Sequence, residues 1–548
     1  MLPGRVPISI LAGLAILLTG CEPSSPSRGS GQLASDQTFT YAVAHDIGVD
    51  GIALDPEAVL VDPVSATIAQ NVFGGLYRHG EHQELVPEIA DGLPEVSADG
   101  RQYTFHLRHQ ARFSNGDPVR ASDFIYSWNR AAADEPDNFV GPVPIAGFDE
   151  VARHDSPAMS GLVAPDDQTL IVKLTQPAGY WLSELLMPSY WVVDQKVILS
   201  NGVDKWWTTP EGLIGTGPFK MTLRTPGTVM EFEPVPNWWG LSTGHLKKVR
   251  VVVVADPAEA LREYDAGTVQ SMNLNPGGPT FDLSYYLNGR RSDLVLGDPF
   301  ATTWVAFNLN SGPFSGLEAG RDGRRAFSLS IDRAQLAKSL CGQTCEPATG
   351  GLVLPGVQGY LGDNEDPNAR FDAAQARDLY RHWDPDGSKV ASLSYAFNFT
   401  PVNWRLARAL QQQWKTNLGV DVKLDEVGDF GLFRNRRSDG DYYLFRAFWL
   451  PDYDSPADWI DPLSPNRIGQ MGGYANPAVD TLAETARAKS PDIALPMYLQ
   501  AERSMVDDAA YAAINYPRTA YLVKPFVQGE GSSAFIGHPW SQIKILSH

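Results

Sequence analysis

Leucine and tryptophan recur every four positions over residues 405–418, which places them on one face of a helix. Gly419 follows this run directly and is a typical helix-terminating residue, because glycine adopts the left-handed conformation at little cost. Residues 420–424 then alternate between apolar and polar side chains, as a half-buried strand does. The pattern predicts a helix, a glycine stop and a strand, and units of this kind build an α/β layer.

Three other segments give clear local signals. Residues 103–107 alternate as a strand would, and the turn at residues 115–118 precedes a helix with Asp123 in its favourable first turn. The near-continuous valine run over residues 248–254 predicts a strand buried on both faces, followed by a helix that ends near Gly267. The apolar face expected for the helix after the turn consists of Phe124, Ile125 and Trp128.

Residues 1–20 have the pattern of a secretory signal. Arg5 precedes an apolar run over residues 8–18, which is too short to span a bilayer but has the length of a signal's hydrophobic region. The run ends in Leu-Thr-Gly-Cys at residues 18–21, which resembles the bacterial lipobox, where the signal is cut before a cysteine that is then acylated. Cys21 would become a lipid-anchored N-terminus. The alternative is a free cysteine in an ordinary signal peptide.

Export also bears on two other parts of the chain. Residues 21–36 are rich in Ser, Pro and Gly and predict a flexible tether, because they cannot bury enough apolar surface to order themselves. Cys341 and Cys345 are four residues apart, and an oxidising compartment would let them form a local disulfide. Two free thiols are the alternative, and no nearby His or Cys completes a zinc site.

The composition is that of a large, acidic globular chain. Its 548 residues correspond to about three or four domains. The chain has 44 Lys and Arg against 64 Asp and Glu, a formal net charge of −20, so its surface is poorly suited to neutralise phosphates. We therefore expect no nucleic-acid partner.

Catalytic motifs are missing from the sequence. It contains neither a His-Glu-x-x-His zinc motif nor a Walker loop. Residues 240–244 fit the bare G-x-S-x-G pattern, but they follow a turn-like stretch, whereas a nucleophile elbow follows a strand and precedes a helix. The sequence predicts a protein that is not an enzyme and needs no cofactor or metal.

Many segments, in order and over about residues 40–545, resemble the solute-binding proteins of ABC importers for oligopeptides and dipeptides, the bacterial extracellular solute-binding proteins of family 5. A single one of these strings would be weak evidence, but the shared order and spacing are specific. The segments are LDP (54–56), NVFGGL (71–76), LVPEIA (85–90), YTFHLR (103–108), ARFSNGDPVRASDFIYSWNR (111–130), GTGPFK (215–220), FNLNSGPF (307–314), RRAFSLSIDR (324–333), QQWKTNLGVDVKL (412–424), WLPDYDSP (449–456), GYANPAVD (473–480) and LVKPFVQG (522–529).

The resemblance implies an α/β, two-lobed periplasmic-binding-protein-like fold with an extra inserted domain. A hinge joins the lobes, which close around an extended peptide. The expected division is a discontinuous lobe I (37–66, 169–281 and 513–548), an inserted small domain (67–168) and lobe II (282–512).

The resemblance also implies a peptide-binding site. Asp452 matches the aspartate that pairs with the peptide's amino terminus in family members, although Asp454, Asp458 and Asp461 crowd the same loop and a surface acid is the alternative. Arg446 matches an arginine that can offset acidic charge or meet a ligand carboxylate.

Three further residues belong to this expected site. Trp449 and Tyr453 either line side-chain pockets or fill the core. Asn403 stands where some oligopeptide binders have a histidine near the far end of the ligand.

The resulting expectation is an exported, lipid-anchored protein on the outer face of the bacterial cell membrane or in the periplasm. It would act as a monomer that captures oligopeptides and delivers them to permease and ATPase subunits. Dipeptides, sugars or metal chelates on the same scaffold remain open, as does a surface lipoprotein that senses peptides or adheres without transport.

Overall fold

The computed structural model describes residues 31–47, 53–59, 63–80, 85–136, 139, 143–240, 242–274, 292–531 and 539–548. The expected signal, the acylation site Cys21 and most of the expected tether lie outside these ranges. Within the described ranges, no helix combines the length and the apolar character that a bilayer crossing requires.

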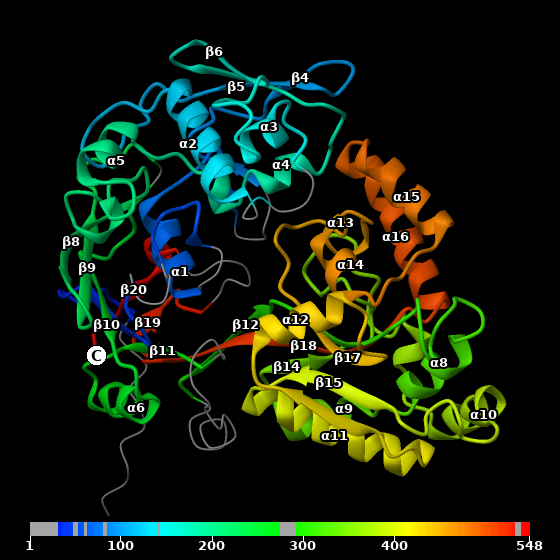
Figure 1. Ribbon diagram of the computed structural model, residues 1–548. Helices are drawn as coiled ribbons and strands as arrows, with labels where there is room; N and C mark the ends of the chain where they lie inside the picture. Colours follow the sequence, from blue (N-terminus) through cyan, green and yellow to red (C-terminus); the bar gives the residue numbers. More distant parts are fainter. Residues whose placement is uncertain are drawn as a thin grey trace, which may run out of the picture.

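One large mixed sheet runs through both lobes. Its strand order is β16-β15-β17-β13-β18-β11-β1-β10-β9-β8, and β12 and β14 also pair with β18 (Tyr511–Val523). The first half of β18 pairs with β13 (Thr302–Phe307) and β14 (Cys345–Pro347), and its second half pairs with β11 (Ser271–Asn273) and β12 (Leu294–Pro299). The red ribbon of β18 in Figure 1 therefore crosses from one lobe to the other.

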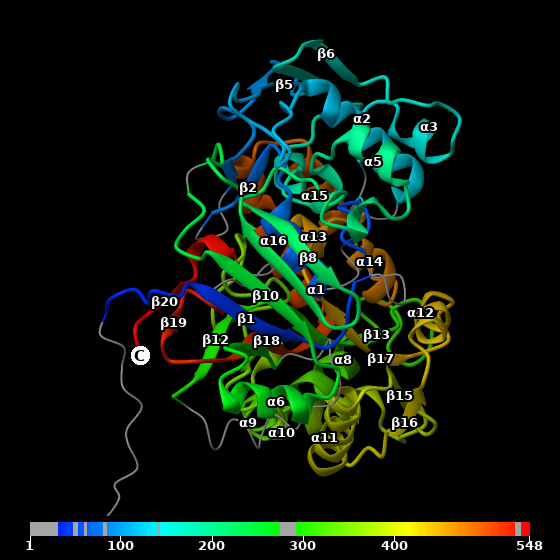
Figure 2. The same cartoon turned by 90° about the vertical axis from the view of Figure 1, so that its left-hand side faces the viewer.

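Lobe I is built on the half of the sheet that holds β1 (Thr38–Val43). β1 pairs in parallel with β10 (Lys248–Val253) and with β11, so their carboxyl ends share one edge. Figure 2 shows this half of the sheet face on, with the small domain above it. The other elements of this lobe are α1 (Pro63–Val72), α5 (Gln195–Asn201), β8 (Phe219–Thr225), β9 (Val229–Pro234), α6 (Pro257–Ala266), β19 (Val527–Gln528) and β20 (Lys544–Ile545).

A separate four-stranded sheet, in the order β4-β5-β7-β6, forms the small domain. β7 (Thr169–Lys173) pairs with β5 (Gln102–His106), so this sheet extends past the boundary expected at residue 168. The other elements of this part are β2 (Tyr77–His79), β3 (Leu85–Pro87), β4 (Glu95–Val96), α2 (Ala121–Asp134), α3 (Phe148–Ala152), β6 (Leu162–Asp166) and α4 (Trp181–Glu184).

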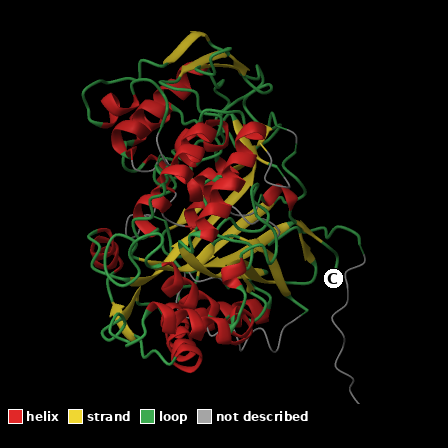
Figure 3. Cartoon of the chain, turned by 90° about the vertical axis from the view of Figure 1, so that its right-hand side faces the viewer, coloured by secondary structure: helices red, strands yellow, loops and turns green. Residues whose placement is uncertain are grey.

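Lobe II places helices on both sides of its strands, as Figure 3 shows by colour. Its strands β15 (Ser394–Asn398), β16 (Lys423–Val427) and β17 (Leu444–Trp449) join β13 and β18 in the large sheet. Its helices are α8 (Arg321–Leu329), α9 (Arg333–Leu340), α10 (Ala373–Trp383), α11 (Pro401–Leu418), α12 (Phe430–Ser438), α13 (Ala457–Ile460), α14 (Pro465–Gln470), α15 (Pro477–Arg487) and α16 (Pro491–Asp507).

The helix–glycine–strand unit is confirmed, with shifted boundaries. α11 begins four residues before the expected start, because Thr400 caps it by accepting a hydrogen bond from the Asn403 amide and Pro401 occupies its first position. Gly419 ends it with a φ of 80°. The strand begins at Lys423 rather than at residue 420.

The expectation for the valine run was wrong in one respect. β10 exists, but its side chains alternate between buried and half-buried positions, so only one face is fully buried. The second face carries Lys248 and Arg250, which both pair with Glu231 on β9. These two basic residues explain why the second face is not fully buried, because an unpaired charge is costly in a core.

A buried ion-pair cluster ties the small domain to lobe I. Arg130 on α2 pairs with Asp55 of the Leu-Asp-Pro segment and with Glu57, which directly follows that segment. Asp55 also accepts a hydrogen bond from the indole of Trp206 at 2.9 Å. The Leu-Asp-Pro motif therefore has a structural role in this chain.

Candidate functional site

A cavity of about 720 Å³ lies between the two lobes. On the side of lobe I it is bounded by the carboxyl ends of β1, β10 and β11 and by the start of α6. On the side of lobe II it is bounded by the segment from β15 into α11, by β17 and by the end of α9. Ligands of open α/β sheets bind at the carboxyl ends of strands, and this volume suits a small organic molecule.

The described walls of this cavity are mainly apolar and carry positive charge. Arg405 and Arg446 line it, and no Asp or Glu is among the described residues of its wall. This polarity contrasts with the net charge of −20 for the whole chain. The apolar wall includes Val43, Met272, Leu274, Phe300, Leu340, Phe399, Val402, Phe430 and Phe448.

Arg446 on β17 is the most distinctive charge of the cavity. Its guanidinium contacts Asn398 Oδ1 at 3.4 Å and lies 5.2 Å from the ring centre of Phe448. Among the described residues no carboxylate pairs with it, and its Nε is buried without a hydrogen-bond partner. Burial lowers the pKa of Arg446 to about 10, so the side chain is still a cation at neutral pH. A partly buried cation without a counter-ion is a physical reason to expect an anionic ligand group here.

Asn403 also lines the cavity, in the first turn of α11. Its side chain is buried and donates to the carbonyl oxygen of Asn398 at 3.0 Å and to its Oδ1 at 3.2 Å. Asn403 therefore holds the Asn398 side chain that contacts Arg446. This placement supports an indirect role, while direct contact with a ligand stays a prediction.

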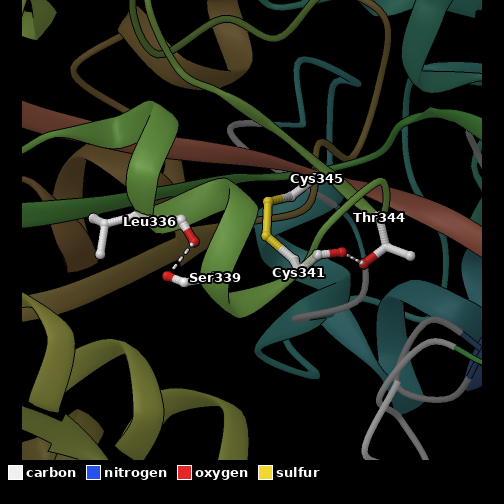
Figure 4. The surroundings of a disulfide bond; sticks show 5 residues. All are labelled: Leu336, Ser339, Cys341, Thr344 and Cys345. Atoms are coloured by element: carbon white, nitrogen blue, oxygen red, sulfur yellow. Dashed lines mark hydrogen bonds between the residues drawn. A yellow bond between two sulfur atoms is a disulfide. The ribbon is translucent and has the colours of Figure 1, made fainter. Parts of the chain in front are cut away.

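Cys341 and Cys345 form a disulfide in the wall of the same cavity. Figure 4 shows the bond between the end of α9 and the start of β14, with the Thr344 hydroxyl donating to the carbonyl oxygen of Cys341 at 2.9 Å. Cys345 in turn faces Pro517 on β18. The disulfide therefore links the cavity wall to the strand that crosses between the lobes.

Asp452 lies outside the described lining of the cavity, in the loop that follows β17. It is half-buried, and its backbone amide donates to Asp458 Oδ2 at 2.8 Å. Burial and the nearby Asp458 raise the pKa of Asp452 well above its usual value. Asp452 is thus a carboxyl without a cationic partner among the described residues, as an anchor for a ligand amine would be before binding.

Trp449 and Tyr453 lie on either side of Asp452 along the chain. Their side chains contact neighbouring residues of the protein. The Trp449 indole donates to Asp458 Oδ2 at 2.9 Å. Tyr453 is 5% exposed and stacks on Tyr180 of the small domain, with ring centres 6.4 Å apart. Pocket roles for the two aromatic side chains stay predictions.

The structure thus divides the expected site residues into two groups. Arg446, Asn403 and the disulfide meet in the cavity wall, whereas Asp452, Trp449 and Tyr453 meet at the contact between lobe II and the small domain.

No motif singled out Glu184, which faces the second group from α4. Its sequence signal was an acid close to the apolar residues Trp181 and Leu182. Among the described residues, no group of His, Cys, Asp and Glu side chains could hold a metal ion.

Two lobes that share a crossing strand and enclose a cavity between them are the architecture of a two-lobed binding protein. The chain belongs to the bacterial extracellular solute-binding proteins, family 5, because residues 84–470 match the model described as "Bacterial extracellular solute-binding proteins, family 5 Middle". It is accordingly a binding protein and not an enzyme.

Several curated relatives cover nearly the whole chain. The periplasmic oligopeptide-binding protein OppA of Escherichia coli is 27% identical over 511 residues, which are 91% of this chain and 90% of that protein. The dipeptide-binding protein DppE of Bacillus subtilis is 25% identical over 559 residues, or 98% and 97% of the two chains. The unliganded open form of the periplasmic murein tripeptide-binding protein MppA has a TM-score of 0.79 at 24% identity and covers 94% of this chain and 99% of that one.

Proposed function

We propose that this protein captures short peptides between its lobes and delivers them to the permease and ATPase subunits of an ABC importer. The observation that carries the proposal is the presence near one segment of two groups of opposite polarity that lack an ion-pair partner among the described residues: Arg446 on β17 and Asp452 just beyond its end. A peptide with free termini offers a carboxylate to the first and an ammonium to the second.

The spacing of these two residues limits the ligand. The two residues are six positions apart along the chain, so their backbones are at most about 20 Å apart at roughly 3.3 Å per residue. An extended peptide has a similar rise per residue and would span this distance with about six residues or fewer. The apolar walls between the lobes can then accept varied side chains.

The names of relatives support peptides over other solutes. OppA of Escherichia coli is described as oligopeptide-binding, DppE as dipeptide-binding and MppA as murein peptide-binding. A solved structure of OppA from Haemophilus influenzae, with a TM-score of 0.68 and 22% identity, is a complex with the peptide RPPGFSPFR. Among these classes of peptide, we propose that the present chain binds oligopeptides.

Anchoring and partners complete the proposal. The Leu-Thr-Gly-Cys segment at residues 18–21 supports acylation of Cys21, which would hold the protein at the outer face of a membrane or in the periplasm. We propose that it acts as a monomer, because each chain carries both lobes and the hinge strand. Mass spectrometry of the membrane-extracted protein would test acylation through the mass of its N-terminal peptide.

The first test is a thermal shift with a pool of tri- to hexapeptides, with the same pool N-acetylated, and with the pool C-amidated. Ligand at 100 times its dissociation constant stabilises a protein by about 2.7 kcal/mol. We expect a clear rise in the melting temperature with free peptides and a smaller rise with either blocked pool. Absence of a shift with all three pools, after removal of ligand retained from expression by unfolding and refolding, would overturn peptide binding.

A second candidate is an apolar anionic solute. The cavity wall carries two arginines and no described acid, and one relative, YgiS of Escherichia coli, is named a probable deoxycholate-binding periplasmic protein. Deoxycholate below its micellar concentration therefore serves as a fourth arm of the thermal shift. Stabilisation by deoxycholate and not by peptides would favour this candidate.

A further inference from the structure

Three buried or half-buried carboxyls converge where the small domain meets lobe II. Glu184 at the end of α4 is 1% exposed, Asp458 on α13 is 0% exposed and Asp452 is half-buried. Asp458 raises the pKa of both Asp452 and Glu184, and Asp452 also raises the pKa of Glu184. We call these residues the carboxyl cluster.

Two observations show that lobe II and the small domain are in direct contact at this point. The Gly179 amide donates to the carbonyl oxygen of Arg487 at 3.2 Å, and the rings of Tyr180 and Tyr453 stack. Gly179 leaves no space for a side chain, because a Cβ would lie on the carbonyl oxygen of Lys489. The carboxyl cluster is therefore enclosed by two parts of the molecule.

No basic side chain of the described residues forms an ion pair with the carboxyl cluster. Arg487 is the nearest candidate on the elements packed around it, but it pairs with Asp461 through Nε at 2.8 Å and Nη2 at 2.5 Å. Asp461 of that ion pair also acts on Glu184, and the remaining titratable groups that face the cluster are tyrosines, which are neutral at pH 7. They are Tyr180, Tyr190, Tyr453 and Tyr498.

The three carboxyls differ in their hydrogen bonds. Asp458 Oδ2 accepts from the Trp449 indole and from the Asp452 amide, whereas its buried Oδ1 has no partner in the described structure. Asp458 is therefore the group that best supports a negative charge, and its pKa is raised only to about 7. Burial, followed by the charge of Asp458, raises the pKa of both Asp452 and Glu184 well above the usual values.

We propose that the carboxyl cluster is a proton-loaded amine subsite, in which the empty protein keeps Asp452 protonated and the entry of a ligand ammonium expels that proton. The Asp452 carboxylic acid and R–NH₃⁺ become a carboxylate–ammonium pair, and one H⁺ leaves to solvent. Asp458 is a positioning residue here, since it acts on the ligand through Asp452. The inference rests on the proposed function and adds proton linkage to it.

The release of a proton on binding makes the affinity for peptides depend on pH. Because binding releases a proton while the peptide amine is charged, affinity rises by up to tenfold per pH unit below the α-amino pKa near 8, and it levels off above that pH. The protein would therefore capture peptides more tightly at neutral pH than at acidic pH.

The test is a pH-stat measurement of protons released when the free-amine peptide pool is added to the purified protein at pH 7. We expect about one proton per bound peptide, and clearly less for Asp458→Asn. Asp454→Asn is the matched control, because Asp454 lies in the same loop but accepts a hydrogen bond from the Gln358 amide instead. It should release the wild-type number of protons.

Two outcomes would overturn the inference. Peptide binding without proton release would contradict it while leaving peptide capture intact. If no peptide binds, infrared spectroscopy of the ligand-free protein tests the protonation of Asp452 directly. A protonated carboxyl band that is present in wild type and lost in Asp452→Asn would support the inference. Identical bands in wild type and variant would reject it.

Discussion

The buried and half-buried arginines Arg324, Arg333 and Arg446 differ in their hydrogen bonding. Arg324 and Arg333 begin and end the Arg-Arg-Ala-Phe-Ser-Leu-Ser-Ile-Asp-Arg motif, and backbone carbonyls surround both guanidinium groups. Their donors are used within lobe II, so they stabilise the fold. Within the part of the chain that the structure describes, Arg446 has one weak polar contact, to Asn398, and it faces the cavity. The difference in hydrogen bonding separates structural arginines from the candidate for binding.

The first residue-scale prediction concerns Arg446. We expect Arg446→Gln to weaken the binding of peptides with a free C-terminus by roughly a hundredfold, because the ligand carboxylate loses its cationic partner in a poorly hydrated site. Isothermal titration calorimetry would measure this change. The exposed Arg408 on α11 provides the control, since Arg408→Gln should bind normally. Equal losses for C-amidated and free peptides would argue against a carboxylate contact.

The second residue-scale prediction concerns Glu502 on α16. It is 0% exposed and accepts hydrogen bonds from the Leu352 and Val353 amides at 2.9 and 3.1 Å. Burial raises the pKa of Glu502 to about 8. The folded state thus binds this proton more tightly than the unfolded state does, and the free energy of unfolding falls between about pH 4.3 and pH 8 by at most about 1.4 kcal/mol per unit.

Glu502→Gln should remove that part of the pH dependence, because an amide oxygen can accept the same two hydrogen bonds without a charge. We expect the variant to be more stable than wild type at pH 8 and similar to it at pH 5. Denaturant unfolding at the two pH values measures the effect. Glu484→Gln, at an exposed position on α15, is the control. A stability difference that does not change with pH would contradict the prediction.

At the scale of elements, α11 shows how local signals and packing combine. Its buried face consists of Leu406, Ala407, Leu410, Trp414 and Leu418, and its first turn forms part of the cavity wall. The cap at Thr400 sets where that turn begins and therefore where Asn403 lies. One helix thus carries both core packing and part of the site.

The end of α11 provides an element-scale prediction. Gly419 has a φ of 80° and open space around its Cα, so an added Cβ costs only the strain of the left-handed conformation. We expect Gly419→Ala to lower the free energy of unfolding by about 1 kcal/mol. Gly428→Ala, at a position with equal space and no positive φ, should be neutral or slightly stabilising. Denaturant midpoints of the two variants would reveal this difference, and equal midpoints would contradict it.

At the scale of the whole molecule, β18 is the structural link that matters most. One half of this strand belongs to each lobe, and Pro517 lies near the change of partners, beside Cys345. Bending at such a junction moves the lobes while the sheet in each half remains intact.

This arrangement predicts closure on ligand binding. A compact chain of this length has a radius of gyration of about 24 Å, and small-angle X-ray scattering should give a smaller value with the peptide pool than without it. Asp452→Asn should show little change at the same peptide concentration. An unchanged radius of gyration in a protein that demonstrably binds peptide would rule out lobe closure.

Much of this protein could be predicted from its sequence. The signals for α11, for α6 with its glycine stop and for the helix at Phe124 and Trp128 depend on residues within one element, and these elements are confirmed. The family, and with it the two-lobed fold, could also be identified, because short motifs keep their order and spacing along a chain of 548 residues. The division into domains and the roles of the site residues remain predictions.

Tertiary structure alone decided which charges are left without partners. Arg446, Arg324 and Arg333 look alike in sequence, and only the folded chain determines that carbonyls surround two of them while the third faces a cavity. Glu184 and Asp458 are 274 residues apart, and the contact between the small domain and lobe II brings them together. Local sequence determines local structure through short-range sterics and hydrogen bonding, whereas burial and charge pairing depend on neighbours that are distant in the chain.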